Sequence, residues 1–253
     1  MAAPGTKRRS EPVTTPIDLA ARIEEHQFPD PEALALALAR DVAATLHSAL
    51  SARGQASLAL SGGNTPKRFL QRLSEQALDW ANVHVTLVDE RWVPADHERS
   101  NAGLLQHHLL RNHAAAARFL PLYREYGHPD PALPGLEQAL ANLPQPFDAA
   151  VLGMGNDGHT ASFFPGGNHL AEALDPASTA RLLSMTAPGA GEPRITLTLP
   201  VLLAARHLFL HIEGPDKQAT LQRAVSGEQG GSDYPIRNLL LAIGAPLPVY
   251  ACP

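Results

Sequence analysis

The sequence has a single cysteine, Cys252, among its 253 residues. One cysteine cannot form a disulfide within the chain, and such sparse use of cysteine is typical of proteins that work in a reducing compartment. The position of Cys252, next to the C-terminus, favours an incidental small residue over a reactive thiol. We therefore expect a cytoplasmic protein without a disulfide.

Long apolar runs are missing as well. No stretch reaches the roughly 18 consecutive apolar residues that indicate a membrane-spanning helix. The polar start, residues 1–16, lacks the apolar centre of a signal peptide, and its Lys7-Arg8-Arg9 triplet is typical of a solvated tail. We expect residues 1–27 to form a polar, flexible segment, and we expect no membrane partner.

An excess of positive charge is absent too. The chain carries 20 lysines and arginines against 25 aspartates and glutamates, which gives a formal net charge of -5. This acidic balance argues against a nucleic-acid-binding surface, so we expect no nucleic-acid partner. If the ligand is an anion, a few well-placed cations must hold it.

The composition is otherwise that of an ordinary soluble globular protein, with 44% hydrophobic and 18% charged residues. The 23 prolines fall mostly between periodic segments, where they mark loops. Strand and helix patterns alternate along the chain, without a repeat or a strong linker. This alternation predicts an α/β fold, with a doubly wound, mostly parallel sheet and helices on both faces, in one domain over residues 28–253.

One helix has clear expected boundaries. It begins near Asp30-Pro31, because aspartate suits the N-cap and proline the first turn, and it ends at Gly54. Leucine or valine at every fourth position gives this helix an apolar face. Apolar runs predict strands at residues 57–60, 83–88, 147–152, 182–185, 193–199, 207–212 and 249–251.

The most informative segment is a glycine-rich turn at residues 153–162, which follows the strand expected at residues 147–152. Its glycines let the backbone turn sharply and approach a ligand closely. The turn carries one carboxylate, Asp157, and one imidazole, His159. Open α/β sheets bind ligands beyond the carboxyl ends of their strands, so this turn is a candidate active site. By itself, a plain strand-to-helix turn explains the local pattern equally well.

A second glycine turn, residues 61–67, connects the strand expected at residues 57–60 to a helix. Thr65 is the expected N-cap of that helix and Pro66 its first residue. A helix N-terminus offers unpaired N–H groups and the positive end of the helix dipole, which suit a phosphate. The spacing differs from that of a P-loop, and a tight turn without a ligand is the alternative.

Charged residues stand at the ends of two further strands. Asp89-Glu90-Arg91 follows the strand at residues 83–88 and precedes Trp92, which a merely solvated loop would not need. Lys217 lies in the first turn of an expected helix, where a cation opposes the helix dipole by roughly 0.3–1 kcal/mol. An anionic ligand bound at this place would make the lysine favourable. The alternative is that the side chain of Lys217 extends into solvent.

As a set, these segments resemble the 6-phosphogluconolactonases, a family within the glucosamine-6-phosphate isomerase/deaminase superfamily. One such motif would be weak, but here several occur in the family's order and spacing. The resemblance covers nearly everything from residue 28 to the C-terminus. It rests on Ser61-Gly62-Gly63-Asn64-Thr65-Pro66, Asp89-Glu90-Arg91-Trp92-Val93, Gly153-Met154-Gly155-Asn156-Asp157-Gly158-His159-Thr160-Ala161-Ser162, Arg194-Ile195-Thr196-Leu197-Thr198 and Gly214-Pro215-Asp216-Lys217.

The resemblance implies hydrolysis of 6-phospho-D-glucono-1,5-lactone to 6-phospho-D-gluconate in the oxidative pentose phosphate pathway, without a metal or organic cofactor. Opening a lactone with water needs a group that takes a proton and donors that face the oxyanion. A histidine, with an ordinary pKa of about 6.5, suits this transfer near neutral pH. We expect His159 to act as general base and to return the proton to the ring oxygen. We expect Asp157 to orient or charge-stabilise the imidazole of His159.

For the phosphate group of the substrate, the resemblance points to the Ser61-Gly62-Gly63 turn together with Arg194 and Lys217. A helix N-terminus with one arginine and one lysine would offset a dianion in an otherwise acidic protein. The other residues assigned to substrate binding are Asn64, Thr65 and Gly155.

Asp89-Glu90-Arg91 is expected to take part in the same site. Arg91 would contact either the phosphate or the charge of the transition state. Asp89 and Glu90 would contact sugar hydroxyls or hold Arg91 in place. The expected partner is a small phosphorylated sugar lactone, and the sequence leaves monomer and homodimer open.

Two other functions fit parts of this pattern. The deaminase branch of the same superfamily opens an amino-sugar ring and has a glutamate five residues after the histidine. This chain has Phe164 there, and Thr160-Ala161-Ser162 matches the lactonase pattern. A non-catalytic sugar-phosphate sensor would need an attached DNA-binding module, and the segment before Asp30 is too short and polar for one.

Overall fold

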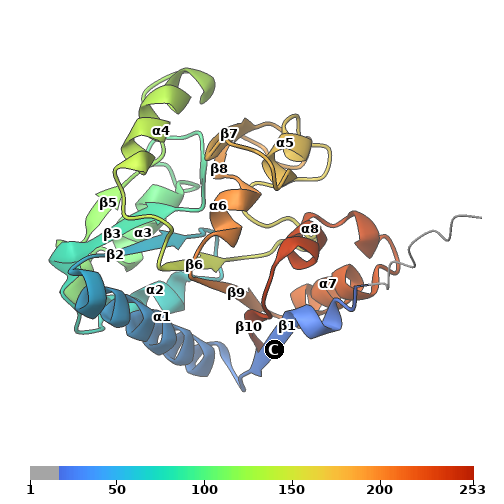
Figure 1. Cartoon of the computed structure of the whole chain (residues 1–253), viewed down its shortest axis with the longest axis horizontal. Helices are drawn as coiled ribbons and strands as arrows, with labels where there is room; N and C mark the ends of the chain where they lie inside the picture. Colours follow the sequence, from blue (N-terminus) through green and yellow to red (C-terminus); the bar gives the residue numbers. More distant parts are fainter. Residues whose placement is uncertain (1–16) are drawn as a thin grey trace, which may run out of the picture.

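A parallel sheet of seven strands forms the centre of the structure, a computed structural model that describes residues 17–253 (Figure 1). The strand order is β1-β10-β9-β6-β2-β3-β5, and every neighbouring pair runs parallel. In chain order these strands are β1 (Ile23–Gln27), β2 (Ala56–Leu60), β3 (Val83–Leu87), β5 (Arg118–Leu120), β6 (Ala149–Leu152), β9 (His207–Glu213) and β10 (Leu247–Cys252). The predicted fold class, a doubly wound and mostly parallel α/β sheet, is confirmed.

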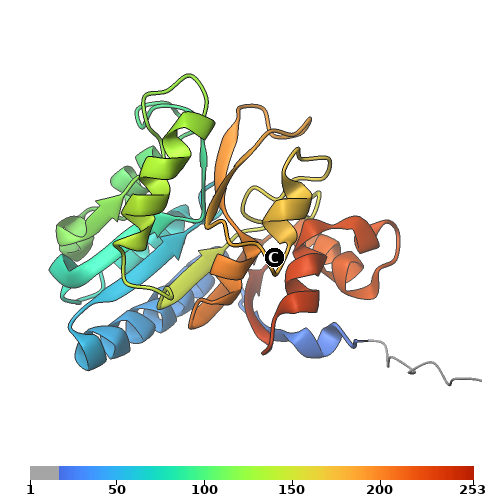
Figure 2. The same ribbon diagram turned by 45° about the horizontal axis from the view of Figure 1, so that its top comes forward.

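Helices cover the sheet. They are α1 (Pro31–Arg53), α2 (Lys67–Ser74), α3 (Asn101–His108), α4 (Leu133–Ala141), α5 (Leu170–Leu174), α6 (Leu199–Leu203), α7 (Pro215–Ser226) and α8 (Pro235–Ala242). Helices α1 and α2 pack against each other on one side of the sheet, and α4 lies on the opposite side (Figures 1 and 2). The inner strands β2 and β6 are buried at every position, as expected for parallel strands covered on both faces.

Helix α1 has the boundaries that its sequence predicts. A side-chain oxygen of Asp30 accepts a hydrogen bond from the backbone N–H of Ala33 at 2.8 Å, and Gly54 ends the helix with a φ of 71°. By length and composition alone, α1 could also cross a membrane. Core helices of globular proteins meet the same criterion, and α1 contributes a buried apolar face that includes Leu34, Leu38, Val42 and Leu46.

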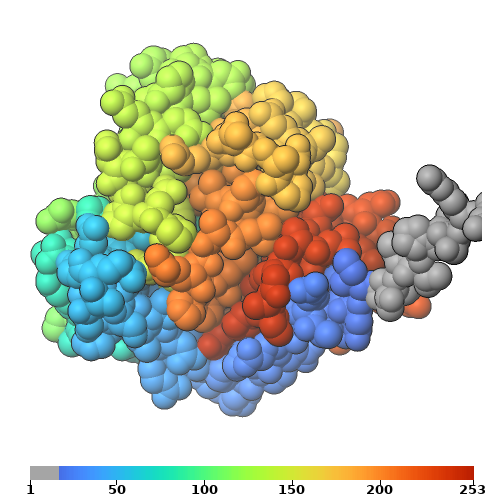
Figure 3. Space-filling model, in the orientation of Figure 1, coloured from blue at the N-terminus to red at the C-terminus, as the bar shows by residue number. Residues whose placement is uncertain are grey.

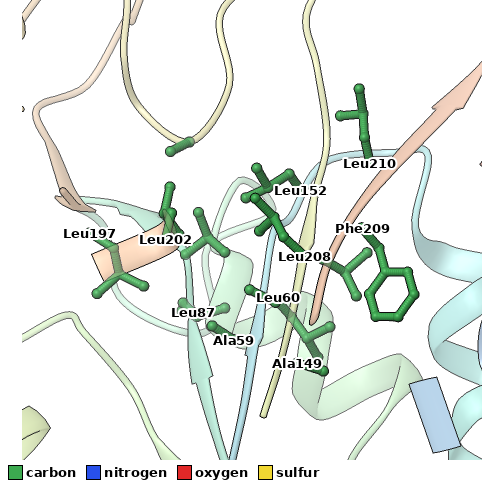
Figure 4. Close-up of a cluster of buried hydrophobic side chains, with 14 of the residues drawn as sticks. Ala59, Leu60, Leu87, Ala149, Leu152, Leu197, Leu202, Leu208, Phe209 and Leu210 are labelled. Atoms are coloured by element: carbon green, nitrogen blue, oxygen red, sulfur yellow. The ribbon is translucent and has the colours of Figure 1, made fainter. Parts of the chain in front are cut away.

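The apolar core lies between the central strands and the helices. Figure 4 shows side chains of β2, β3, β6 and β9 meeting residues of the segment around α6. All of these side chains are buried: Ala59, Leu60, Leu87, Ala149, Leu152, Leu197, Leu202, Leu208, Phe209 and Leu210. Because close packing surrounds β2 and β6, the turns that follow these strands start from well-defined positions.

A second, antiparallel sheet of three strands has the order β4-β8-β7. Its strands are β4 (Asp89–Arg91), β8 (Arg194–Leu197) and β7 (Leu182–Met185). In this sheet Arg91 lies opposite Arg194, and Asp89 lies opposite Thr196. The sequence predicts Asp89-Glu90-Arg91 only as charges after a strand, because nothing in three charged residues identifies a partner strand so far along the chain.

The prediction of a flexible segment over residues 1–27 is wrong for the part that the structure describes. β1 pairs in parallel with β10, from Ile23 opposite Leu247 to Gln27 opposite Ala251, and Leu19 is buried. Figure 3 shows this N-terminal segment packed against the C-terminal part of the chain. The segment reads as polar because β1 is an edge strand, whose side chains are largely exposed. The basic triplet at residues 7–9 lies outside the described residues.

Candidate active site

A cavity of about 230 Å³ lies beyond the carboxyl ends of β2 and β6. The strands that follow β2 in the chain, β3 and β5, lie on one side of it in the sheet, whereas the later strands β6, β9 and β10 lie on the other side. The direction in which the sheet grows therefore reverses between β2 and β6. Such a reversal is where open α/β sheets bind ligands, because the turns after the two strands diverge there. Most of the predicted site residues line this cavity: Ser61, Gly62, Gly63, Asn64, Thr65, Asp89, Arg91, Gly155, His159, Arg194 and Lys217.

His159 and Asp157 are hydrogen-bonded to each other. Nδ1 of His159 lies 2.5 Å from Oδ1 of Asp157, and the backbone N–H of His159 donates to the same oxygen at 3.2 Å. Burial raises the pKa of Asp157, but the hydrogen bond and the charge of His159 outweigh burial and hold this pKa below its ordinary value. An ionised carboxylate can only accept, so Nδ1 is the donor in this hydrogen bond, and in the neutral imidazole Nε2 is then the nitrogen with the lone pair.

Gly155 makes room for this pair. A Cβ atom at residue 155 would lie 2.3 Å from Cε1 of His159 and 2.6 Å from Oδ1 of Asp157. Any larger residue would therefore displace the imidazole or break its hydrogen bond. Gly155 lines the cavity, whereas Asp157 does not and is joined to it by its hydrogen bond to His159.

Two arginines, Arg91 and Arg194, meet at one wall of the cavity because β4 and β8 pair. Each donates one hydrogen bond of 2.5 Å to a backbone carbonyl, Arg91 to Arg99 and Arg194 to Ala190. The Nε atom of each is buried without a hydrogen-bond partner within residues 17–253. Burial lowers the pKa of Arg194, and the nearby carboxylate of Asp89 raises it. Guanidinium groups with unused donors suit a phosphate or a developing oxyanion.

Lys217 lies opposite the turn that follows β2. Its Nζ donates a hydrogen bond of 2.8 Å to Oγ1 of Thr65. Burial lowers the pKa of Lys217, and Glu213 raises it. The prediction that Thr65 caps α2 is wrong: the helix begins at Lys67 without a side-chain cap, since the hydroxyl of Thr65 serves Lys217 instead. The buried hydroxyl of Ser61 has no partner within residues 17–253.

Glu90 does not reach the cavity, so the prediction that it contacts sugar hydroxyls is wrong. Its carboxylate is fully buried and faces the N-terminus of α3, where unpaired N–H groups attract an acceptor. It accepts the backbone N–H groups of Arg91 at 2.7 Å, Asn101 at 2.8 Å and Ala102 at 2.7 Å. The alternative prediction is that Glu90 holds Arg91 in place. The hydrogen bond from the backbone N–H of Arg91 to the Glu90 carboxylate agrees with it.

Asp89 has a different environment from Glu90. Its Oδ2 accepts a hydrogen bond from the hydroxyl of Ser162 at 2.6 Å, and the residue lines the cavity beside Arg91. The interaction of Asp89 with a sugar hydroxyl stays a prediction.

Asn101 and His211 also line the cavity, although neither is among the residues predicted from the sequence. Asn101 donates from Nδ2 to the backbone oxygen of Asp89 at 2.8 Å and lies so close to Gly62 that a Cβ there would be 1.9 Å from its Oδ1. Nε2 of His211 lies 3.0 Å from Oε1 of Glu213, and burial lowers the pKa of this histidine. Asn101 follows a capping serine and His211 lies inside an apolar strand, so neither has a local signal of function.

Within residues 17–253, no group of three or more histidine, cysteine, aspartate or glutamate side chains is placed to hold a metal ion.

Comparison with known proteins gives consistent results. The family model described as glucosamine-6-phosphate isomerases/6-phosphogluconolactonase matches residues 29–243. The 6-phosphogluconolactonase of Rhizobium meliloti is 50% identical over 229 residues, which cover 90% of this chain and 98% of that protein. The corresponding protein of Pseudomonas putida is 46% identical over 237 residues, which cover 94% and 96%.

Solved structures agree with the sequence relatives. The crystal structure of a 6-phosphogluconolactonase from Shewanella baltica superposes with a TM-score of 0.87 at 38% identity, covering 91% of this chain and 98% of that one. A monomeric glucosamine-6-phosphate deaminase superposes with a TM-score of 0.68 at 17% identity, covering 91% and 97%. The second likeness shows a shared fold alone.

The buried carboxyl of Glu90 predicts a specific pH dependence of stability. Burial raises its pKa from 4.5 to about 7, against the lowering effect of the N–H groups that it accepts. Between these pH values the folded chain holds a proton that the unfolded chain has released. Raising the pH from 4.5 to 7 should therefore lower the contribution of Glu90 to the free energy of unfolding, by up to about 3 kcal/mol.

This prediction can be checked by urea unfolding of the wild type and Glu90→Gln across that range. The difference in unfolding free energy between them should fall as the pH rises, because glutamine does not titrate. Exposed Glu98→Gln is the control and should show no such trend. A wild-type-minus-Glu90→Gln difference that stays constant with pH would contradict the prediction.

Proposed function

The chain belongs to the family of glucosamine-6-phosphate isomerases and 6-phosphogluconolactonases, and from this premise we propose that it hydrolyses 6-phospho-D-glucono-1,5-lactone to 6-phospho-D-gluconate. The observation that carries the proposal is the Asp157–His159 pair, set at the edge of a cavity whose other walls hold Arg91, Arg194 and Lys217. A proton acceptor and an anion-binding wall in one cavity are what hydrolysis of a phosphorylated lactone requires.

The proposed reaction begins with water. Nε2 of His159 takes a proton as the water oxygen bonds to the lactone carbonyl carbon, and the negative charge of Asp157 stabilises the imidazolium that forms. The carbonyl oxygen becomes an oxyanion, for which Arg91 is the proposed donor. The tetrahedral intermediate then collapses, the bond from the carbonyl carbon to the ring oxygen breaks, and His159 returns the proton to that oxygen. The products are a hydroxyl group and a carboxylic acid, which ionises at neutral pH.

The phosphate of the substrate is proposed to lie between the turn after β2 and the cations Arg194 and Lys217. The hydroxyl of Ser61, which has no partner within residues 17–253, and the glycine backbone at Gly62 and Gly63 supply donors, and the N-terminus of α2 supplies the positive end of its dipole. A dianion at this place would offset the desolvation that lowers the pKa of Lys217.

The deaminase alternative has less support. Phe164, at the position of the deaminase glutamate, is buried against the imidazole of His159, so the ring-opening acid is missing. The relatives at up to 50% identity are named 6-phosphogluconolactonases. A non-catalytic sensor is disfavoured by the intact Asp157–His159 pair.

We further propose a cytoplasmic enzyme without a nucleic-acid or membrane partner, and either a monomer or a homodimer fits the proposal.

Loss of the general base should abolish catalysis. Purified protein is expected to accelerate lactone hydrolysis well beyond the spontaneous rate, and His159→Asn should remove at least about 100-fold of that gain, the usual contribution of a positioned base. The control is His47→Asn, on the exposed side of α1. Hydrolysis can be followed by the acid released or by oxidation of the product. Wild-type hydrolysis at the spontaneous rate would refute the proposal, and ammonia release from glucosamine 6-phosphate would favour the deaminase.

Lys217→Ala should chiefly raise KM for the phosphorylated lactone, by about 10-fold or more, because a charge-assisted hydrogen bond of about 1.5–3 kcal/mol to the phosphate is lost. The control is Arg40→Ala, which removes a positive charge from an exposed residue of α1 that does not line this cavity. Steady-state kinetics on both variants checks this. Equal KM values for Lys217→Ala and wild type would exclude Lys217 from the phosphate site.

A further inference from the structure

The ring of Phe164 lies in contact with two site residues at once. Its centroid is 4.3 Å from that of the His159 imidazole, with 33° between the ring planes. On the same phenyl ring, Cζ of Arg194 lies 5.2 Å from the centroid. Phe164 is only 4% exposed, so the packing around it leaves the ring little freedom. It touches both the proposed base and a proposed phosphate ligand, yet has no polar group of its own.

The contact of Phe164 with His159 restricts the rotation of the imidazole ring, which the hydrogen bond to Asp157 leaves partly free. The bond from Nδ1 to Asp157 fixes one edge of the imidazole, but the torsion that turns the ring has broad minima. A phenyl ring packed against the imidazole limits that rotation. Together, Asp157 and Phe164 define the direction in which Nε2 presents its lone pair. Direction is decisive here, because a displacement of about 1 Å at a reacting group can cost about 100-fold in rate.

The contact with Arg194 has an electrostatic consequence. The face of an aromatic ring attracts a guanidinium group, which favours Arg194 at its observed place on Phe164. The phenyl ring also contacts His159, so one apolar side chain packs against both the proposed base and a proposed phosphate ligand.

We propose that Phe164 is a positioning residue for the general base. Its ring holds the imidazole of His159 in the orientation set by Asp157. This inference rests on the proposed lactone hydrolysis and adds to it a residue that carries no reactive group. The inference also gives a physical reason for Phe164 at the position of the deaminase glutamate. A glutamate here would place a carboxylate against both His159 and Arg194.

The test compares Phe164→Leu with Phe163→Leu. Both phenylalanines are buried, and both substitutions remove the same atoms from adjacent positions in the chain. Phe163 makes no ring contact with His159 or Arg194 in the described part of the chain. Both variants should therefore lose thermal stability, which is the ordinary result of a smaller core side chain. Only Phe164→Leu should also lose kcat, by about 10-fold or more, with a change in KM of less than about threefold.

Two further variants keep the test decisive if Phe164→Leu folds poorly. Phe164→Met nearly preserves the volume but lacks a flat face, so it should fold and still lose kcat. Phe164→Tyr retains the ring and should keep most of the wild-type kcat. Equal kcat losses at positions 163 and 164, full kcat in Phe164→Met, or a rise in KM alone would overturn the inference. An inactive wild type would instead refute the proposed function from which the inference starts.

Discussion

The hydrogen bond between Asp157 and His159 is the interaction on which the proposed site depends. Two residues apart, these side chains can meet only because the turn after β6 folds back on itself, with Gly155 leaving the space that a Cβ would fill. The turn itself begins where a fully buried strand ends, next to the point at which the strand order reverses. A buried parallel sheet thus fixes the position of one imidazole, and Asp157 determines which of its nitrogens carries the proton.

The rest of the site gathers positive charge in an acidic protein. The chain has a net charge of -5, yet its cavity gathers Arg91, Arg194 and Lys217. Like charges brought together under partial burial are unfavourable, and the pKa values of Arg194 and Lys217 are both lowered by burial. The buried Nε atoms of the arginines have no partner within residues 17–253. A dianionic substrate would relieve both costs, so these features support a site that is completed by its ligand.

Much of the fold was predictable because its signals are local. The cap at Asp30, the apolar runs and the glycine turns each lie within a few residues. These local signals predict the parallel sheet and most of the residues that line the cavity. What was missed depends on contacts distant in sequence. Nothing near Asp89-Glu90-Arg91 predicts its pairing with β8, and nothing near Asn101 predicts its contact with Gly62. Strand β1 was missed because an edge strand can be polar, and the role of Glu90 because its partners lie on α3.

The central claim is that Asp157 and His159 work as one unit, and a double-mutant cycle tests it most directly. The values of kcat/KM would be measured for wild type, Asp157→Asn, His159→Asn and the double variant. If Asp157 acts only through the imidazole, as proposed, its replacement costs nothing further once His159 is gone, so the double variant should match His159→Asn. A double variant whose loss equals the product of the two single losses would show independent roles and contradict the account.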